Sequence, residues 1–195
     1  MSVNRTGVTL MGDLERPDLG GPDADRLLSA LFDRHASALH AYLARRLDPA
    51  TADDLVAETF LAAWATRDRY RPDRAPARAW LFGIATNLLR RHARSEVRGL
   101  RAYAREGGQA VDVAAPESLA VSRADASTHI RAMAGGIANL RQEERDVLLL
   151  VAWAGLQPAE VAEALGITAA TCRTRLHRAR RALRGYAELL EEKDA

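Results

Sequence analysis

Apolar residues recur three or four positions apart along two long stretches of the chain, residues 25–98 and 128–190. This spacing is typical of amphipathic α-helices that turn one face toward a core. In the first stretch the pattern predicts three helices. The first has an apolar stripe from Leu27 to Leu47, and the third covers residues 79–94. The second is expected to bury Leu55, Val56, Phe60, Leu61 and Trp64. The pattern therefore predicts an all-α fold.

The segments around these stretches lack periodicity. Residues 1–24 are rich in Gly, Pro and Asp, a composition that indicates a flexible arm. Residues 99–127 contain Gly107, Gly108 and Pro116, which indicates a linker with a helical stretch at either end. We therefore expect two small helical domains, 25–98 and 128–190, joined by a flexible linker.

Two polar positions punctuate the first domain. Asp48–Pro49 is expected to end the first helix, and Thr51, with the acidic Asp54 three residues later, is expected to cap the second. Residues 66–78 form a charged, proline-containing loop before the third helix.

The second domain contains a helix, a tight turn and a second helix. Pro158 suits a first helical turn, Gly166 accepts positive φ in the turn, and Thr168 can cap the next helix. Cys172 falls where that helix needs a small apolar side chain. These offsets favour a helix-turn-helix whose second helix lies in the DNA major groove.

Arginine dominates the second helix of this motif. Six arginines and no acid occur between positions 173 and 184: Arg173, Arg175, Arg178, Arg180, Arg181 and Arg184. The alternative is an ordinary helical hairpin with a solvated basic face. That alternative explains the arginines but not the glycine and small apolar residues at their particular offsets.

Charge is segregated although the net charge is only +2. Residues 48–58 carry acids and no base, which favours a basic protein partner over DNA; a merely solvated face is an equally good alternative. Residues 90–105 carry six arginines against Glu96 alone, a composition suited to a phosphate backbone.

The third helix adds aromatic and amide groups to this basic segment. Trp80, Phe82, Asn87, Arg90 and Arg91 offer stacking surfaces, base-edge hydrogen bonds and phosphate contacts, as single-stranded DNA binding requires. The alternative places Trp80 in the core, which we favour for that residue, and Phe82 and Asn87 on an ordinary surface.

Several classes of function are disfavoured. The chain has one cysteine and scattered histidines, so we expect no disulfide framework, no metal site and no cofactor. It has no phosphate-binding glycine loop, and a nucleophilic Cys172 conflicts with its predicted burial. No apolar run approaches the ~20 residues of a membrane span, and the N-terminus lacks the charged-then-apolar order of a signal peptide. We expect a cytoplasmic protein that is not an enzyme and has no membrane insertion.

Four strings together resemble the bacterial sigma factors of the extracytoplasmic-function (ECF) class, within the sigma-70 family. They are Leu31–Phe32–Asp33–Arg34–His35, Asp53–Asp54–Leu55–Val56–Ala57–Glu58–Thr59–Phe60, Ala79–Trp80–Leu81–Phe82–Gly83–Ile84–Ala85–Thr86–Asn87, and residues 171–180. Each string is moderately specific, but four in this order are highly specific. The resemblance departs from the family at Ala170–Thr171–Cys172, where Gly-Thr-Val is usual.

The resemblance implies a role for each surface. The first domain is similar to sigma domain 2, so the helix with Asp53, Asp54, Glu58 and Phe60 is expected to dock on the β′ clamp helices of core RNA polymerase. The third helix and its preceding loop are expected to open and recognise the −10 element. The DNA-facing candidates there are Trp80, Phe82, Asn87, Arg90, Arg91 and Arg94.

The second domain resembles sigma domain 4, which recognises the −35 element and contacts the β flap. Its DNA-facing candidates are Thr171, Arg173, Thr174, His177, Arg178 and Arg181. The resemblance also implies an anti-sigma factor as a partner. A free-standing helix-turn-helix regulator remains an alternative, but it gives the acidic helix and the helix over 79–94 no role.

Overall fold

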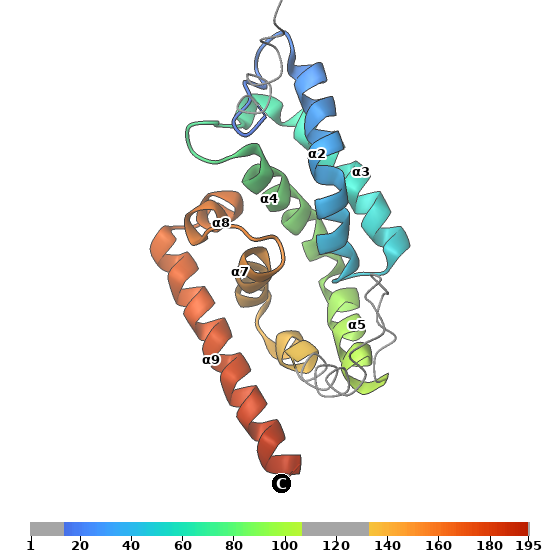
Figure 1. Ribbon diagram of the computed structural model, residues 1–195, viewed down its shortest axis with the longest axis vertical. Helices are drawn as coiled ribbons and strands as arrows, with labels where there is room; N and C mark the ends of the chain where they lie inside the picture. Colours follow the sequence, from blue (N-terminus) through green and yellow to red (C-terminus); the bar gives the residue numbers. More distant parts are fainter. Residues whose placement is uncertain (1–13, 107–132, 195) are drawn as a thin grey trace, which may run out of the picture. The chain divides into compact units, whose positions relative to one another are not determined.

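The computed structural model in Figure 1 describes residues 14–106 and 133–194, and all the regular elements in these ranges are helices, as the sequence predicted. They are α2 (Ala24–Ala44), α3 (Pro49–Ala65), α4 (Ala77–Leu89), α5 (Ala93–Glu106), α7 (Gln142–Ala152), α8 (Pro158–Leu165) and α9 (Ala169–Asp194). Short 3₁₀ helices lie at Arg67–Arg69 and Arg90–His92. Residues 133–139 are also helical.

The helices form two compact units. One unit comprises the chain up to His92 together with Leu149–Thr174, and the other comprises Ala93–Leu148 with Arg175 onward. The flexible linker predicted over 99–127 lies mostly outside the described residues, although α5 continues through its start as far as Glu106.

The core of the first unit lies between α2, α3 and α4. Leu31, Leu43, Leu81 and Leu89 are fully buried, and each such side chain contributes roughly 1.5–3 kcal/mol when it leaves water. The Tyr42 hydroxyl lies 3.1 Å from the Thr86 hydroxyl in the same core and joins α2 to α4.

The cap of α3 differs from the sequence expectation. Thr51 was expected to cap this helix, but Asp48 does so, because its carboxylate accepts the Thr51 N–H at 3.0 Å and Pro49 occupies the first helical position. This bond to the backbone lowers the pKa of Asp48. Aspartate followed by proline therefore ends one helix and begins the next.

The third predicted helix is divided. It begins at Ala77 and ends at Leu89, and a 3₁₀ turn at Arg90–His92 then leads into α5. The single helix expected over 79–94 is therefore two α-helices separated by a tighter turn.

Residues 14–23 are ordered on the loop before α4, whereas the sequence predicted a flexible arm. Pro17 and Leu19 are buried, and the Ala77 N–H donates to the Glu15 carbonyl at 2.8 Å. Within the loop, the Tyr70 hydroxyl donates to the Ala75 carbonyl at 3.1 Å. The loop is thus held from two sides at the entrance to α4.

The local geometry of the helix-turn-helix agrees with the sequence prediction. A capping box between Gln157 and Glu160 opens α8, and Gly166 closes it with φ of 64°. The Thr168 hydroxyl accepts the Thr171 N–H at 3.1 Å and caps α9, and Cys172 is buried. In the first unit α8 packs against α4.

In the second unit, one buried ion pair ties α5 to the start of α7. Arg145 lies 3.3 Å from the carboxylate of Glu96, and the same guanidinium donates to the carbonyls of Ile137, Ala138 and Leu140. Both side chains are almost inaccessible to solvent. Removal of one partner from such a pair typically costs about 3–5 kcal/mol.

Candidate functional site

The first candidate surface is the face of α9 that points away from the core. Arg173, Thr174, His177, Arg178 and Arg181 are all exposed, and only Thr171 is half-buried. The Thr171 hydroxyl lies 2.8 Å from that of Thr168, within the cap. The apolar positions Cys172, Leu176 and Ala179 are buried, so one helix presents an apolar face and a basic face.

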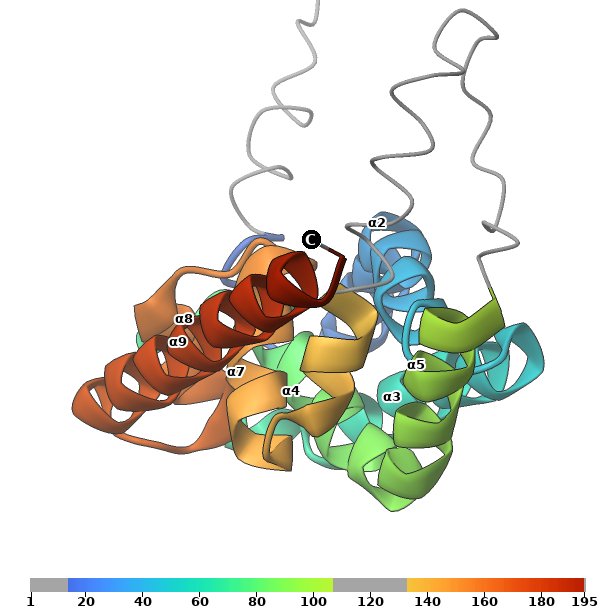
Figure 2. The same ribbon diagram turned by 90° about the horizontal axis from the view of Figure 1, so that it is seen from below.

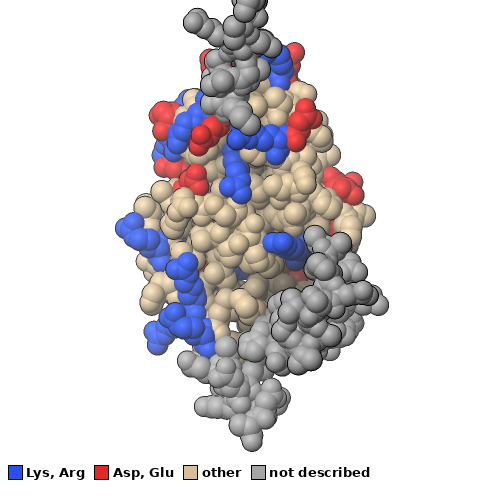
Figure 3. Space-filling model, viewed as in Figure 1, with Lys and Arg blue, Asp and Glu red and all other residues tan. Residues whose placement is uncertain are grey.

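The arginines of this face are available to a ligand. Within the part of the chain that the structure describes, Arg173 and Arg178 form no ion pair. Figure 3 shows Lys and Arg side chains without Asp or Glu along the described part of α9. A cationic helix face with free guanidinium groups can form bidentate contacts with guanine edges and with phosphates.

The second candidate surface, α4, is much less exposed than predicted. Phe82 is 1% exposed, and its ring packs edge-on against Tyr42 at 5.3 Å. Both earlier expectations for Phe82, DNA contact and ordinary surface, therefore disagree with its place in the core. Trp80 is half-buried and packs on Tyr70 at 4.9 Å, so it lies between the core alternative and a fully DNA-facing position. Asn87 is exposed.

The basic residues that follow α4 are partly engaged. Arg94 is exposed and Arg90 is half-buried. Arg91 forms an ion pair of 2.5 Å with Glu58 of α3. This pair links a residue predicted to face DNA with a residue predicted to face polymerase, a relationship that the sequence did not indicate.

The third candidate surface is the acidic face of α3. Asp53 and Asp54 are exposed and Glu58 is half-buried. His40 of α2 lies 3.3 Å from the Asp53 carboxylate. The fourth predicted contact, Phe60, is only 8% exposed, because its ring packs against Phe32 of α2 at 4.9 Å. Phe60 therefore supports this surface more than it forms it.

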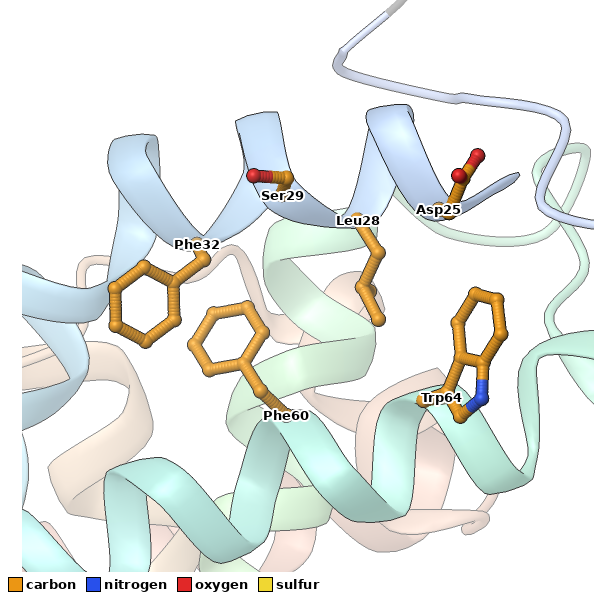
Figure 4. A pocket seen from close by; sticks show the side chains of 6 residues that line it. All are labelled: Asp25, Leu28, Ser29, Phe32, Phe60 and Trp64. Carbon is orange, nitrogen blue, oxygen red and sulfur yellow. The ribbon is translucent and has the colours of Figure 1, made fainter. Parts of the chain in front are cut away.

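A shallow apolar groove runs along the seam between α2 and α3 (Figure 4). It is lined by Asp25, Leu28, Ser29, Phe32, Phe60 and Trp64. Phe32 is 45% exposed and Trp64 40%, and the neighbouring Leu61 is 70% exposed. An exposed apolar cluster beside carboxylates is typical of a protein-binding surface.

The sequence prediction placed Leu61 and Trp64 in the core, and this was wrong. At about 100° per residue, Ala63 lies about 80° around the helix from Leu55, whereas Trp64 lies about 180° and Leu61 about 240° from it. Leu55 and Ala63 are buried, so Leu61 and Trp64 lie on the other side of α3. A helical projection could have found this second apolar face.

Two further arginines lie on the loop and first turn of α4. Arg74 forms a 3.1 Å ion pair with Glu163 of α8, and the Arg78 guanidinium donates to the Ala154 carbonyl. Burial, with the positive charges of Arg34 and Arg78, lowers the pKa of the nearby His35 to about 4. His35 is therefore neutral near pH 7.

The described residues hold no cluster of His, Cys, Asp and Glu suited to a metal ion. None of the helices within the described ranges has the length and apolar character to cross a membrane.

Comparison with known proteins identifies both parts of the chain. Residues 31–99 match the Sigma-70 region 2 family, and residues 131–183 match the Sigma-70 region 4 family. The chain is 35% identical over 162 residues to the ECF RNA polymerase sigma factor SigL of Mycobacterium tuberculosis, covering 81% of this chain and 87% of that protein. It is 34% identical to the RNA polymerase sigma factor CnrH of Cupriavidus metallidurans, covering 88% and 98%.

Solved structures support the same assignment. CnrH in complex with the cytosolic domain of CnrY matches with a TM-score of 0.57 and 26% identity, covering 96% of this chain and 97% of that chain. The sigma factor RpoE of Bartonella quintana, in complex with the anti-sigma factor NepR, shares the fold with a TM-score of 0.55 and 22% identity, covering 82% and 96%. The chain belongs to the ECF sigma factors of the sigma-70 family, which direct RNA polymerase to promoters.

Proposed function

We propose that this sigma factor acts through three separate surfaces: α9 binds the −35 element, the exposed end of α4 with the residues that follow binds the −10 element, and the α2–α3 side docks on core RNA polymerase. The observation that carries the proposal is the unpaired basic face of α9 on a helix-turn-helix. The polymerase supplies the chemistry, so the chain itself needs no catalytic group.

On α9, Arg173 and Arg178 are the principal candidates for base contacts. Both are exposed, and they lie five residues apart in the first turns of the helix, the part that enters the major groove in helix-turn-helix proteins. A bidentate arginine–guanine contact contributes about 1–3 kcal/mol of discrimination. Thr174, His177 and Arg181 complete the same face, and Thr171 acts mainly through the cap.

Near the −10 element, Asn87 is the candidate for a base-edge contact, and Arg90, Arg91 and Arg94 are candidates for phosphate contacts. The exposure of Asn87, Arg91 and Arg94 along the end of α4 and the start of α5 supports this assignment, while Arg90 is half-buried. The segment expected to be the preceding loop, residues 67–79, includes the first turn of α4 from Ala77. The part of it before α4 is the candidate for holding a base flipped from the duplex, a step that costs a few kcal/mol of unstacking.

On the polymerase side, Asp53, Asp54 and Glu58 present negative charge toward the basic β′ clamp helices. The groove with Phe32 and Trp64 adds apolar area, and such desolvated aromatic groups usually supply most of the binding energy at interfaces. The β flap is the second expected polymerase contact, through the helix-turn-helix domain.

An anti-sigma factor is the other proposed partner. The similar sigma factors CnrH and RpoE were each solved in complex with a second protein, the cytosolic domain of CnrY and the anti-sigma factor NepR. We infer that such a partner covers the acidic face of α3 or the basic face of α9, because those faces are needed for transcription.

The experiment that tests the proposal is run-off transcription by core polymerase reconstituted with the full chain on a promoter library. Asp53→Lys with Asp54→Lys should reduce binding to core while leaving DNA binding by the isolated chain unchanged. Arg173→Ala should weaken DNA binding while leaving binding to core polymerase unchanged. Loss of both activities in both variants, with folding intact, would contradict separate surfaces.

A further inference from the structure

The N-terminus of α4 lacks a side-chain cap. The first N–H groups of a helix have no partner within the helix and must find one elsewhere. Pro76 precedes α4 and offers no side-chain hydrogen bond, and the Ala77 N–H donates instead to the Glu15 carbonyl at 2.8 Å. A segment from much earlier in the chain therefore caps the helix that we assign to the −10 element.

The same early segment contacts the loop before α4, residues 66–76, at a second point. The Arg16 guanidinium donates to the Pro72 carbonyl in the middle of this loop, whereas the Glu15 carbonyl binds at its end. We call residues 15–19 the brace. In Figures 1 and 2 the brace belongs to the darkest blue part of the ribbon, which comes shortly before α2.

The brace is itself fixed to the first unit. Pro17 is buried and Leu19 is only 2% exposed, although segments outside regular elements usually run over the surface. The Asp18 carboxylate accepts the Gly20 N–H at 3.0 Å, within the turn that leads toward α2. The brace thus has a defined position from which its two contacts can restrain the loop.

The loop has a buried aromatic side and an exposed basic side. Tyr70 is buried, its hydroxyl donates to the Ala75 carbonyl at 3.1 Å, and its ring packs on Trp80 at 4.9 Å. Burial raises the pKa of Tyr70 to about 12, so the hydroxyl stays a donor near pH 7. Arg69 and Arg71 are exposed. Cationic groups beside aromatic rings can hold a phosphate and an unstacked base.

We propose that the brace positions this loop for the −10 element and that Arg16 is a positioning residue for the selection of a −10 base. The proposal rests on the proposed function of the loop. A loop already held in its binding conformation loses little conformational entropy when a base enters it. A loop that samples other conformations is competent for only a fraction of the time, so it discriminates less between bases.

Arg16→Met is the direct test, because it keeps the length of the side chain at an exposed position but removes every hydrogen-bond donor. Arg26→Met is the matched control. It makes the same change at an exposed arginine of α2 whose ion pair, with Asp23, lies at the surface. Arg16→Lys keeps a charged donor and should behave like the wild-type chain.

The first measurement is amide hydrogen exchange of the free chain, followed by mass spectrometry. In Arg16→Met, peptides covering residues 68–77 should exchange about five- to tenfold faster, because the loop has lost a hydrogen bond, while peptides from α3 should be unchanged. Arg26→Met should change neither. Unchanged exchange of the loop in Arg16→Met, or faster exchange in α3 as well, would overturn the brace.

The second measurement is run-off transcription by reconstituted polymerase, on a promoter selected from the library and on templates with single-base changes in either element. In Arg16→Met, discrimination against −10 changes should fall about three- to tenfold, with discrimination at the −35 element and affinity for core unchanged. Arg16→Lys should retain the wild-type discrimination. An equal loss at both elements would contradict a positioning role in the −10 loop.

The wild-type chain separates the failure of this inference from the failure of the proposed function. If the wild-type chain discriminates between −10 bases and Arg16→Met does so equally well, the brace is refuted and the role of the loop stands. If the wild-type chain transcribes no template, or transcribes without any dependence on the −10 sequence, the proposed function of the loop is refuted as well.

Discussion

Helices α4 and α9 were both predicted to bind DNA, yet the structure gives them very different surroundings. α9 is buried on one side only, and its predicted DNA-facing arginines are exposed and unpaired within the described residues. α4 is enclosed on most of its circumference by α2, α3 and α8, and Phe82 lies in the core. α9 thus presents an exposed basic face, whereas α4 exposes little beyond Asn87.

Under the proposed function, this difference suits two forms of DNA. The −35 element would be read as intact duplex, for which an exposed helix face suffices. The −10 element is melted, and its recognition requires surfaces for unstacked bases. Around α4 such surfaces are limited while α8 contacts it. The comparison therefore predicts that substitutions at buried positions of α4 change stability, whereas substitutions on the exposed face of α9 change DNA binding.

The largest effect is expected at the buried aromatic residue of α4. Phe82→Ala should lower the free energy of unfolding by about 3–5 kcal/mol, because it removes a fully buried ring that packs on Tyr42. Asn87→Ala, at an exposed position of the same helix, should change stability by less than about 0.5 kcal/mol but reduce transcription. Urea unfolding monitored by circular dichroism distinguishes them; equal stability for both variants would mean that Phe82 is not a core residue.

Substitutions on α9 should act on DNA binding without affecting the fold. Arg173→Ala and Arg178→Ala should each weaken binding to a −35 duplex by about 1–3 kcal/mol, with core polymerase binding retained. Arg184→Ala, also exposed on α9 but about three helical turns beyond Arg173, is the control. Fluorescence anisotropy at fixed salt measures the change, and a similar loss from Arg184→Ala would indicate general charge attraction instead of recognition.

Stability should fall as the pH decreases toward 5, because His35 is held neutral in the fold. Its pKa is about 4 in the folded state against 6.5 for a free side chain, so the unfolded chain binds the proton first and is favoured as the pH falls through this window. The expected loss between pH 7.5 and pH 5 is about 1–2 kcal/mol.

His35→Gln should remove most of this pH dependence, which urea unfolding at the two pH values measures. The lowered pKa of Asp48 acts at lower pH, since its contribution is present above the ordinary pKa of aspartate and is lost only on further acidification. An unchanged pH dependence in His35→Gln would show that another group is responsible.

The smallest effect is expected at the Arg91–Glu58 ion pair. The Arg91 side chain is 59% exposed and the Glu58 side chain 44%, so the pair should contribute less than about 1 kcal/mol. Glu58→Gln should free Arg91 and raise the affinity for single-stranded −10 DNA by less than about fivefold, while it weakens binding to core polymerase. If Glu58→Gln raises DNA affinity equally in an Arg91→Ala background, the gain does not come from this pair.

The sequence predicted well those features that depend on near neighbours along the chain. The left-handed turn at Gly166, the cap at Thr168 and the burial of Cys172 are all confirmed. Each follows from steric or hydrogen-bonding requirements within a few residues. The separation of apolar and basic faces on α9 could likewise be predicted, because it depends only on the helical spacing of residues in that helix.

Features that depend on distant partners were missed. Phe82, for example, is buried because Tyr42 of α2 packs on it. The pairing of Arg145 with Glu96 and of Arg91 with Glu58 joins residues 49 and 33 positions apart. Local periodicity contains no information about such partners.

Promoter-dependent initiation by the reconstituted holoenzyme tests the central claim most directly. Core polymerase with the wild-type chain should produce defined run-off transcripts from a subset of a promoter library, and Arg173→Ala should lose transcripts that depend on the −35 sequence while still binding core. Failure of the wild-type chain to bind core and to start transcription on any template would contradict the account.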